Sequence, residues 1–172
     1  MIETLISSKT RIKLLLKFFL NGNNKGYLRG LEAEFGESSN AIRIELNRLE
    51  DAGLLTSSLQ GNKKIFTADQ QHPLYEDIHN ILVKYTGLDK IVERVAQSLG
   101  QLEEVYVVGD LAKGLATEVI ELVFAGDVDV LRLKELVDKV EKKIHKKVMY
   151  TCVGQYGFSA SIYPDHLLLW SK

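Results

Sequence analysis

Apolar residues at the start of the chain recur with the spacing of amphipathic helices. The predicted helices are residues 8–20, 27–35 and 38–52. In the third, Ile42, Leu46 and Leu49 form one apolar stripe, Ser38 is suited to cap the first turn, and Gly53 is suited to end the last. The pattern therefore predicts three helices, of which the last two are joined by a tight glycine turn, as in a helix-turn-helix.

A β-hairpin is predicted directly after the third helix. Residues 54–59 and 64–68 have strand character, and residues 60–63 have the composition of a turn. The hairpin tip carries Lys63 and Lys64, which would lie against a phosphate backbone. Three helices followed by a hairpin is the order of elements in a winged helix.

The second half of the chain alternates helices and strands. The predicted helices are residues 74–86, 88–99 and 130–144, and the predicted strands are residues 105–109, 119–124 and 147–153. This order indicates a small α/β domain with a helix-covered sheet. The apolar stretch 167–170 must also be covered, either by completing this domain or by a homodimer interface. We expect the domains to be residues 1–70 and 88–172, with 71–87 as a linker or dimerisation helix.

Charge and composition narrow the functional classes. Residues 1–68 hold 10 Lys and Arg against 7 Asp and Glu, a net charge of +3, while the remainder holds 12 against 16, a net charge of −4. This asymmetry fits a nucleic-acid contact in the first half. The single cysteine, Cys152, excludes an intramolecular disulfide, and we expect it to be buried. Without a membrane-length apolar run or a signal peptide pattern, we expect a cytoplasmic protein with no membrane partner.

Polar side chains suited to reading DNA lie on the third helix, away from its apolar stripe. They are Ser39, Asn40, Arg43 and Asn47. Such groups bind base edges and phosphates in a major groove, and Lys63 and Lys64 would add phosphate contacts. Glu45 opposes this hypothesis, since it is expected on the solvent side of the helix and would repel phosphate there.

The first half resembles winged-helix transcriptional regulators of the ArsR type. Residues 47–55, Asn-Arg-Leu-Glu-Asp-Ala-Gly-Leu-Leu, are similar to the end of the recognition helix in that class. The resemblance covers residues 5–68 and implies that helix 38–52 enters the major groove while wing 56–67 lies on the backbone. It also implies a dimer built by the helix after the wing, although that helix could equally pack on its own domain or bridge to the next.

The second half resembles the minimal nucleotidyltransferase domain, but its motif is broken. That family has Gly-Ser-x-x-x-Gly after one strand and Asp-x-Asp on the next, which hold nucleotide phosphates and Mg²⁺. Here Asp110 replaces the serine between Gly109 and Gly114, and Val119 and Glu121 replace the two aspartates. Since Val119 cannot bind a cation, we expect an inactive domain. The alternative is one metal bound by Asp110 with Glu121, or with Asp127 and Asp129.

The sequence therefore predicts an α+β protein with an N-terminal winged helix-turn-helix and a small nucleotidyltransferase-like α/β domain. We expect a homodimeric, sequence-specific regulator that binds double-stranded DNA and is not an enzyme. No catalytic residue, metal or cofactor is expected, because His72 and His79 lack partners at ligand spacing. A small-molecule effector is left open. The alternatives are a divergent nucleotidyltransferase, or a protein-interaction module, which acidic residues near the third helix favour.

Overall fold

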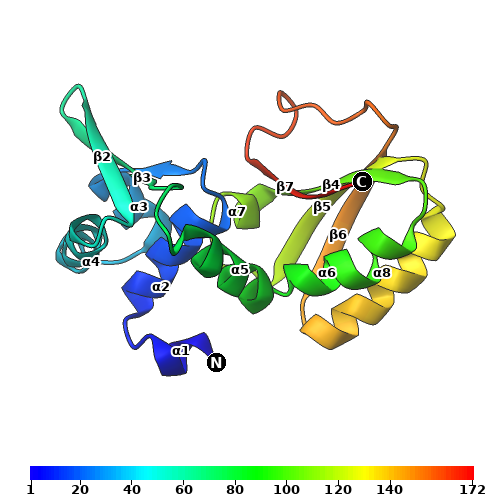
Figure 1. The fold of residues 1–172 in the computed structure, drawn as a ribbon, viewed down its shortest axis with the longest axis horizontal. Helices are drawn as coiled ribbons and strands as arrows, with labels where there is room; N and C mark the ends of the chain where they lie inside the picture. Colours follow the sequence, from blue (N-terminus) through cyan, green and yellow to red (C-terminus); the bar gives the residue numbers. More distant parts are fainter. The chain divides into compact units, whose positions relative to one another are not determined.

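A computed structural model describes residues 1–172 as two compact units, Met1–Leu82 (unit 1) and Val83–Lys172 (unit 2). The protein is an α+β fold with one sheet in each unit (Figure 1). None of its helices has the length and apolar character needed to cross a membrane. The division at residues 70 and 87 expected from the sequence stays a prediction.

Unit 1 consists of short helices and a three-stranded antiparallel sheet. Its elements are α1 Ile2–Leu5, α2 Lys9–Leu15, a π-helical turn Leu16–Leu20, β1 Lys25–Gly26, α3 Leu28–Phe35, α4 Ser39–Asp51, β2 Leu55–Gln60 and β3 Lys63–Ala68. The strand order is β1-β3-β2. The π-helical turn is buried throughout, and Phe18, Phe19 and Leu20 are fully enclosed. Strand β1 was not predicted, because two residues are too few to show a period.

The turn between α3 and α4 is built by local sequence signals. Gly36 takes a left-handed φ of 64°, which ends α3. The Ser38 hydroxyl then accepts a hydrogen bond from the Ala41 amide at 3.2 Å and caps α4. At the other end, the Leu54 amide donates to the Leu49 carbonyl at 2.9 Å across Gly53. The predicted start and end of this helix are confirmed.

The hairpin β2–β3 has a two-residue turn. Gln60 is paired with Lys63, so Gly61 and Asn62 form the connection, and Gly61 adopts a φ of 64°. Lys63 therefore lies at the first position of β3 rather than in the turn, where the sequence pattern had placed it. Because side chains alternate along a strand, Lys63 and Lys64 leave the hairpin in opposite directions.

Unit 2 is a mixed sheet with helices on one face. Its elements are α6 Leu88–Arg94, a 3₁₀ turn Ala96–Ser98, β4 Leu102–Val108, α7 Gly109–Ala112, β5 Val119–Gly126, α8 Val130–Ile144, β6 Lys147–Val153 and β7 His166–Ser171. Helix α5, Tyr75–Thr86, starts in unit 1 and ends in unit 2. The strand order is β6-β5-β4-β7, with only β5 and β6 parallel. Helices α6 and α8 cover one face (Figure 1).

The C-terminal tail completes unit 2. Strand β7 pairs with β4, which confirms the first of the two expectations for the apolar stretch 167–170. The preceding loop carries Phe158, whose ring stacks on Tyr106 with centroids 3.6 Å apart. Burial and a hydrogen bond to Glu104 raise the pKa of Tyr106 to about 12. Cys152 is exposed on edge strand β6, so the prediction of a buried thiol is wrong.

Candidate nucleic-acid interface

The polar face of α4 is open to solvent. Asn40, Arg43 and Asn47 are exposed, and Ser39 is partly exposed. The opposite stripe of Ile42, Leu46 and Leu49 is buried and fixes how the helix is rotated on unit 1. Arg43 stays close to its own helix, with Nη2 3.5 Å from the Ser39 hydroxyl. The structure therefore brings the four predicted α4 residues to one exposed face.

Glu45 lies in the interior of unit 1, and the expectation that it faces solvent is wrong. Its side chain is 7% exposed and bonds to Arg11 Nε at 2.8 Å and to Arg48 Nη1 at 3.3 Å. Burial would raise the pKa of this carboxyl, but hydrogen bonds from Arg11 and Ser8 and the charges of Arg11 and Arg48 hold the pKa below its ordinary value. The charge that opposed DNA binding is thus turned inward and paired.

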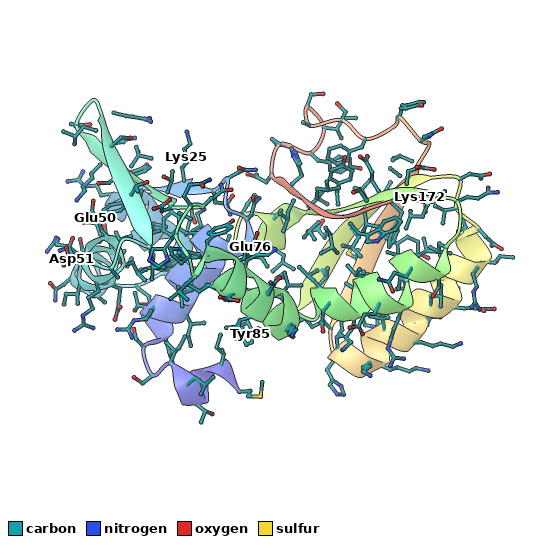
Figure 2. All side chains as sticks on the ribbon, viewed as in Figure 1. Lys25, Glu50, Asp51, Glu76, Tyr85 and Lys172 are labelled. Atoms are coloured by element: carbon teal, nitrogen blue, oxygen red, sulfur yellow. The ribbon has the colours of Figure 1, made fainter.

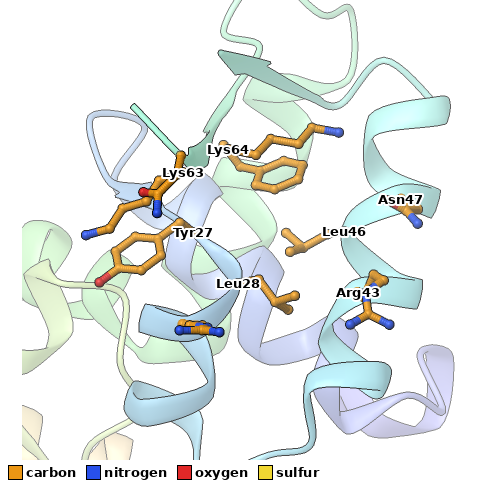
Figure 3. Close-up of a pocket in the computed structure, with 10 residues that line it drawn as sticks. Tyr27, Leu28, Arg43, Leu46, Asn47, Lys63 and Lys64 are labelled. Carbon is orange, nitrogen blue, oxygen red and sulfur yellow. The ribbon is translucent and has the colours of Figure 1, made fainter. Parts of the chain in front are cut away.

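A groove lies beside α4, between α3 and the hairpin (Figure 3). Its volume is about 520 Å³. The lining residues are Tyr27, Leu28, Arg29, Arg43, Leu46, Asn47, Asn62, Lys63, Lys64 and Phe66. Four of these residues are cationic and none is acidic, while Leu28, Leu46 and Phe66 are apolar. The groove can therefore hold an anionic ligand that also has apolar surface.

The two hairpin lysines have different surroundings. Lys63 Nζ lies over the Tyr27 ring, 4.4 Å from its centroid. Lys64 Nζ bonds to the Glu50 carboxylate at 2.7 Å, and the Ser57 hydroxyl donates to the other oxygen of Glu50. Hydrogen bonds from Lys64 and Ser57 lower the pKa of Glu50. Glu50 lies near the end of α4 (Figure 2), so its side chain connects that helix to both hairpin strands.

Other acidic groups near α4 are also paired within unit 1. Lys17 is buried and bonds to Glu34 at 2.8 Å, and Lys13 bonds to Glu37 at 2.6 Å. Hydrogen bonds from Lys13 and Thr10 lower the pKa of Glu37. Lys13 of α2 and Lys17 of the π-helical turn therefore neutralise these two carboxylates. The acidic residues that favoured a protein-interaction module are therefore in part internal ion-pair partners.

In the glycine loop of unit 2, residues 109–114, both glycines adopt the left-handed backbone conformation that glycine favours. Gly109 and Gly114 adopt φ values of 68° and 79°, and Asp110 is exposed, 3.7 Å from Lys113 Nζ. Gly109 packs so closely on the Glu121 carboxylate that a Cβ there would overlap it. The third strand, β6, offers Met149 and Thr151 rather than a carboxylate on the face of the sheet that Glu121 shares.

The remaining candidate ligands have structural roles. Asp129 caps α8 by accepting a hydrogen bond from the Arg132 amide at 3.1 Å. His72 Nδ1 accepts from the Leu74 amide, and His79 Nδ1 lies 2.9 Å from the Phe19 carbonyl. No group of three or more His, Cys, Asp or Glu side chains is arranged to hold a metal ion.

Three residues of the groove region escaped the sequence analysis. Tyr27 and Arg29 line the groove from the start of α3, and Glu50 holds Lys64 from α4. Helical periodicity places Arg29 on a polar face of α3, and this pattern could have identified Arg29 as a candidate binding residue. The partners of Tyr27 and Glu50 depend on how the hairpin folds against the helices, and no local pattern carries that information.

Comparisons with known proteins give partial structural likenesses. No model of a protein family matches this chain, and no curated protein matches it. A protein solved as a candidate nucleotidyltransferase from Sulfolobus solfataricus is 29% identical, with a TM-score of 0.38 over 52% of this chain and 83% of that one. A chain from the complex of a tri-AMPylated HEPN toxin with MNT antitoxin, from Shewanella oneidensis, is 16% identical, with a TM-score of 0.38 over 52% and 73%. AF1382 from Archaeoglobus fulgidus is 16% identical, with a TM-score of 0.40 over 49% and 97%.

These findings correct two predictions. The assignment to ArsR-type regulators fused to a degenerate nucleotidyltransferase-like domain is wrong, since the similar structures whose names state a role are a nucleotidyltransferase and toxin–antitoxin proteins, and none is named as an ArsR-type protein. The prediction that the chain is not an enzyme is contradicted by the same names. What the comparisons support is an α+β fold with nucleotidyltransferase-like neighbours over about half of the chain.

Proposed function

We propose that unit 1 binds double-stranded DNA in a sequence-specific manner. In this proposal unit 1 acts as a winged helix, with α4 in the major groove and the hairpin β2–β3 along the backbone. The observation that carries it is the groove of about 520 Å³ beside α4, whose charged lining residues are all basic. A cationic groove next to an exposed polar helix face suits a polyanion that also presents base edges.

Each predicted contact has a chemical reason. Asn40, Arg43 and Asn47 carry the amide and guanidinium groups that bind adenine and guanine edges. Ser39 and Lys63 are suited to phosphate oxygens. With Glu45 turned inward, the exposed positions of α4 from residue 39 to residue 48 include no carboxylate. Nothing on that part of the helix would therefore repel a phosphate backbone.

The test begins with selection of bound sequences from random duplex DNA. Arg43→Gln should then weaken binding to the selected site by about 1–3 kcal/mol and relax the preference at one base position. Arg132→Gln is the matched control, since it removes the same charge from an exposed position in unit 2. If Arg43→Gln and Arg132→Gln bind the selected site equally well, α4 does not read DNA.

The proposal includes two copies of the chain on one site. One inserted helix reads only a few base pairs, and the net charge of +3 on residues 1–68 is modest for tight binding by a single copy. Two copies related by a two-fold axis would select a palindrome with half-sites about 10 base pairs apart. Selected sequences without that symmetry would contradict the homodimer.

A second candidate function is the binding or transfer of a nucleotide by unit 2. It is favoured by one observation, the contact of the left-handed Gly109 with the Glu121 carboxylate at the start of α7. The residues do not fit a pair of Mg²⁺ ions, because no three ligating side chains converge there. Titration with ATP by calorimetry tests this candidate. Binding that Glu121→Gln abolishes and Glu118→Gln preserves would support it, and no binding would remove it.

A further inference from the structure

We propose that the cations of the groove have two separate tasks. Arg29 and Lys63 form a subsite for a phosphodiester of the DNA backbone, whereas Lys64 is a positioning residue that Glu50 holds to fix the hairpin. This inference rests on the proposed function of unit 1, and it assigns the backbone contacts within that function. It adds Arg29 to the binding surface and removes Lys64 from direct phosphate contact.

Lys64 forms an ion pair with Glu50 inside unit 1. Its amine lies 2.7 Å from Glu50, whose other oxygen accepts the Ser57 hydroxyl. Because the carboxylate cancels the charge of the lysine, this pair adds little to the attraction of a polyanion. The three side chains come from α4, β2 and β3, so together they tie the hairpin to the end of α4. Their arrangement fits a positioning role.

Lys63 keeps its charge available. Its contact with the Tyr27 ring directs the amine but leaves it a net cation. Figure 3 shows Lys63 extending toward Tyr27 while Lys64 extends the other way from the hairpin. Arg29, the second residue of α3, is exposed and has no carboxylate partner. Two unneutralised cations thus line the groove opposite α4.

The ligand that fits is a backbone phosphate of a strand whose bases face α4. Arg43 and Asn47 line the same groove as Arg29 and Lys63, so one strand could present bases to the first pair and phosphate to the second. Leu28 and Phe66 also line the groove and give it apolar surface, which suits the sugar faces of the strand. A free phosphate ion would use only the cations, and the two sources can be separated by experiment.

The experiment measures how duplex affinity of the full chain depends on salt. Neutralising one phosphate contact should reduce the slope of log affinity against log salt by about 0.9. Arg29→Gln and Lys63→Gln should each show this loss, while Lys64→Gln should keep the wild-type slope. Glu50→Gln should steepen the slope by up to about 0.9, because it frees the Lys64 charge. Arg132→Gln serves as the unaffected control. A slope reduced by about 0.9 in Lys64→Gln, or an unchanged slope in Arg29→Gln, would overturn the assignment.

Inorganic phosphate separates the two ligand sources. At constant ionic strength, phosphate at millimolar concentration should not displace duplex DNA, because the subsite takes the phosphodiester only together with its strand. Calorimetric binding of phosphate alone that is lost in Arg29→Gln would overturn the phosphodiester assignment in favour of a free-anion site.

Hydrogen exchange of the free protein tests the positioning role without DNA. Exchange of the β2 and β3 amides should accelerate about 1.4- to 5-fold in both Glu50→Gln and Lys64→Gln, and Lys64→Arg should restore the wild-type rate. Unchanged exchange would refute the role of Glu50. If the wild-type chain binds no duplex at all, the proposed function fails, and the exchange result still decides whether Glu50 fixes the hairpin.

Discussion

At the residue scale, the buried carboxylate of Glu45 helps to decide which face of α4 is available. Glu45 is held by Arg11 and Arg48, and Lys17 is held by Glu34, so charges of both signs lie in the interior. Each buried charge is paired, as the cost of desolvation requires. The rotation of α4 is therefore fixed by ion pairs as well as by its apolar stripe.

Replacing Glu45 by Gln should lower the free energy of unfolding by about 1–3 kcal/mol at pH 7, because Arg11 and Arg48 lose a charged partner. Hydrogen bonds and the charges of Arg11 and Arg48 hold the pKa of Glu45 in the folded state below its ordinary value, so this contribution is fully present above the unfolded pKa and is lost as pH falls through the lower folded pKa. Denaturant unfolding followed by circular dichroism from pH 7 to pH 3 measures it.

The matched control for this change is Glu135→Gln, which alters an exposed ion pair with Arg132. It should change stability by less than about 0.5 kcal/mol at every pH. Equal effects of the two substitutions would mean that the burial of Glu45 has no energetic consequence.

The exposure of a side chain could be predicted from the sequence where no other element packs against it. Asn40, Arg43 and Asn47 are exposed as the helical period of α4 predicted. Glu45 was misplaced, since the period separates apolar from polar positions but does not show which polar position meets another helix. The task of Lys64 could not be predicted either, because Glu50 lies 14 positions away in the sequence.

At the element scale, the sequence predicted best the elements that carry their own end signals. Helix α8 and strand β6 have the predicted bounds, 130–144 and 147–153, and Asp129 caps the helix. The segment 158–163 alternates like a strand but forms a loop whose Phe158 stacks on Tyr106. Only Phe158 of this segment packs on the sheet in this way, while Ile162 is exposed, so the alternation does not mark a strand here.

The hairpin turn depends on one backbone conformation. Gly61→Ala should lower the free energy of unfolding by about 1 kcal/mol, because Gly61 has a φ of 64° and no atom lies within 4 Å of a Cβ built there. The penalty is therefore conformational rather than steric. Gly100→Ala is the control, since Gly100 has equal space and no positive φ. Thermal unfolding of both variants tests this prediction, and equal melting temperatures would contradict it.

At the scale of the whole molecule, each unit buries its own apolar side chains. Phe19 is fully enclosed in unit 1, and Phe124 is fully enclosed in unit 2. The charge split and the change in the order of elements along the sequence predict a division of this kind. It could not indicate that α5 starts in one unit and ends in the other, because a continuous helix has no internal boundary signal.

Cavity-forming substitutions should act on one unit at a time. Phe124→Ala should destabilise unit 2 by about 3–5 kcal/mol and leave duplex binding by unit 1 unchanged at temperatures where unit 2 stays folded. Phe19→Ala should destabilise unit 1 and reduce duplex binding. Hydrogen exchange resolved by residue, with binding measured in parallel, checks both. Equal loss of protection in both units from either substitution would show that the chain unfolds as one cooperative body.

The exposure of Cys152 has a practical consequence for counting the copies of the chain. It is the only thiol of the chain and lies on edge strand β6, so two molecules can be joined through it by oxidation. Partial burial raises the pKa of this thiol, which keeps the thiolate fraction low at neutral pH and slows that reaction. A covalent pair formed in this way would imitate a dimer, so mass measurements need a reductant. The same thiol offers a single attachment point for a fluorophore that reports on unit 2 when DNA is added.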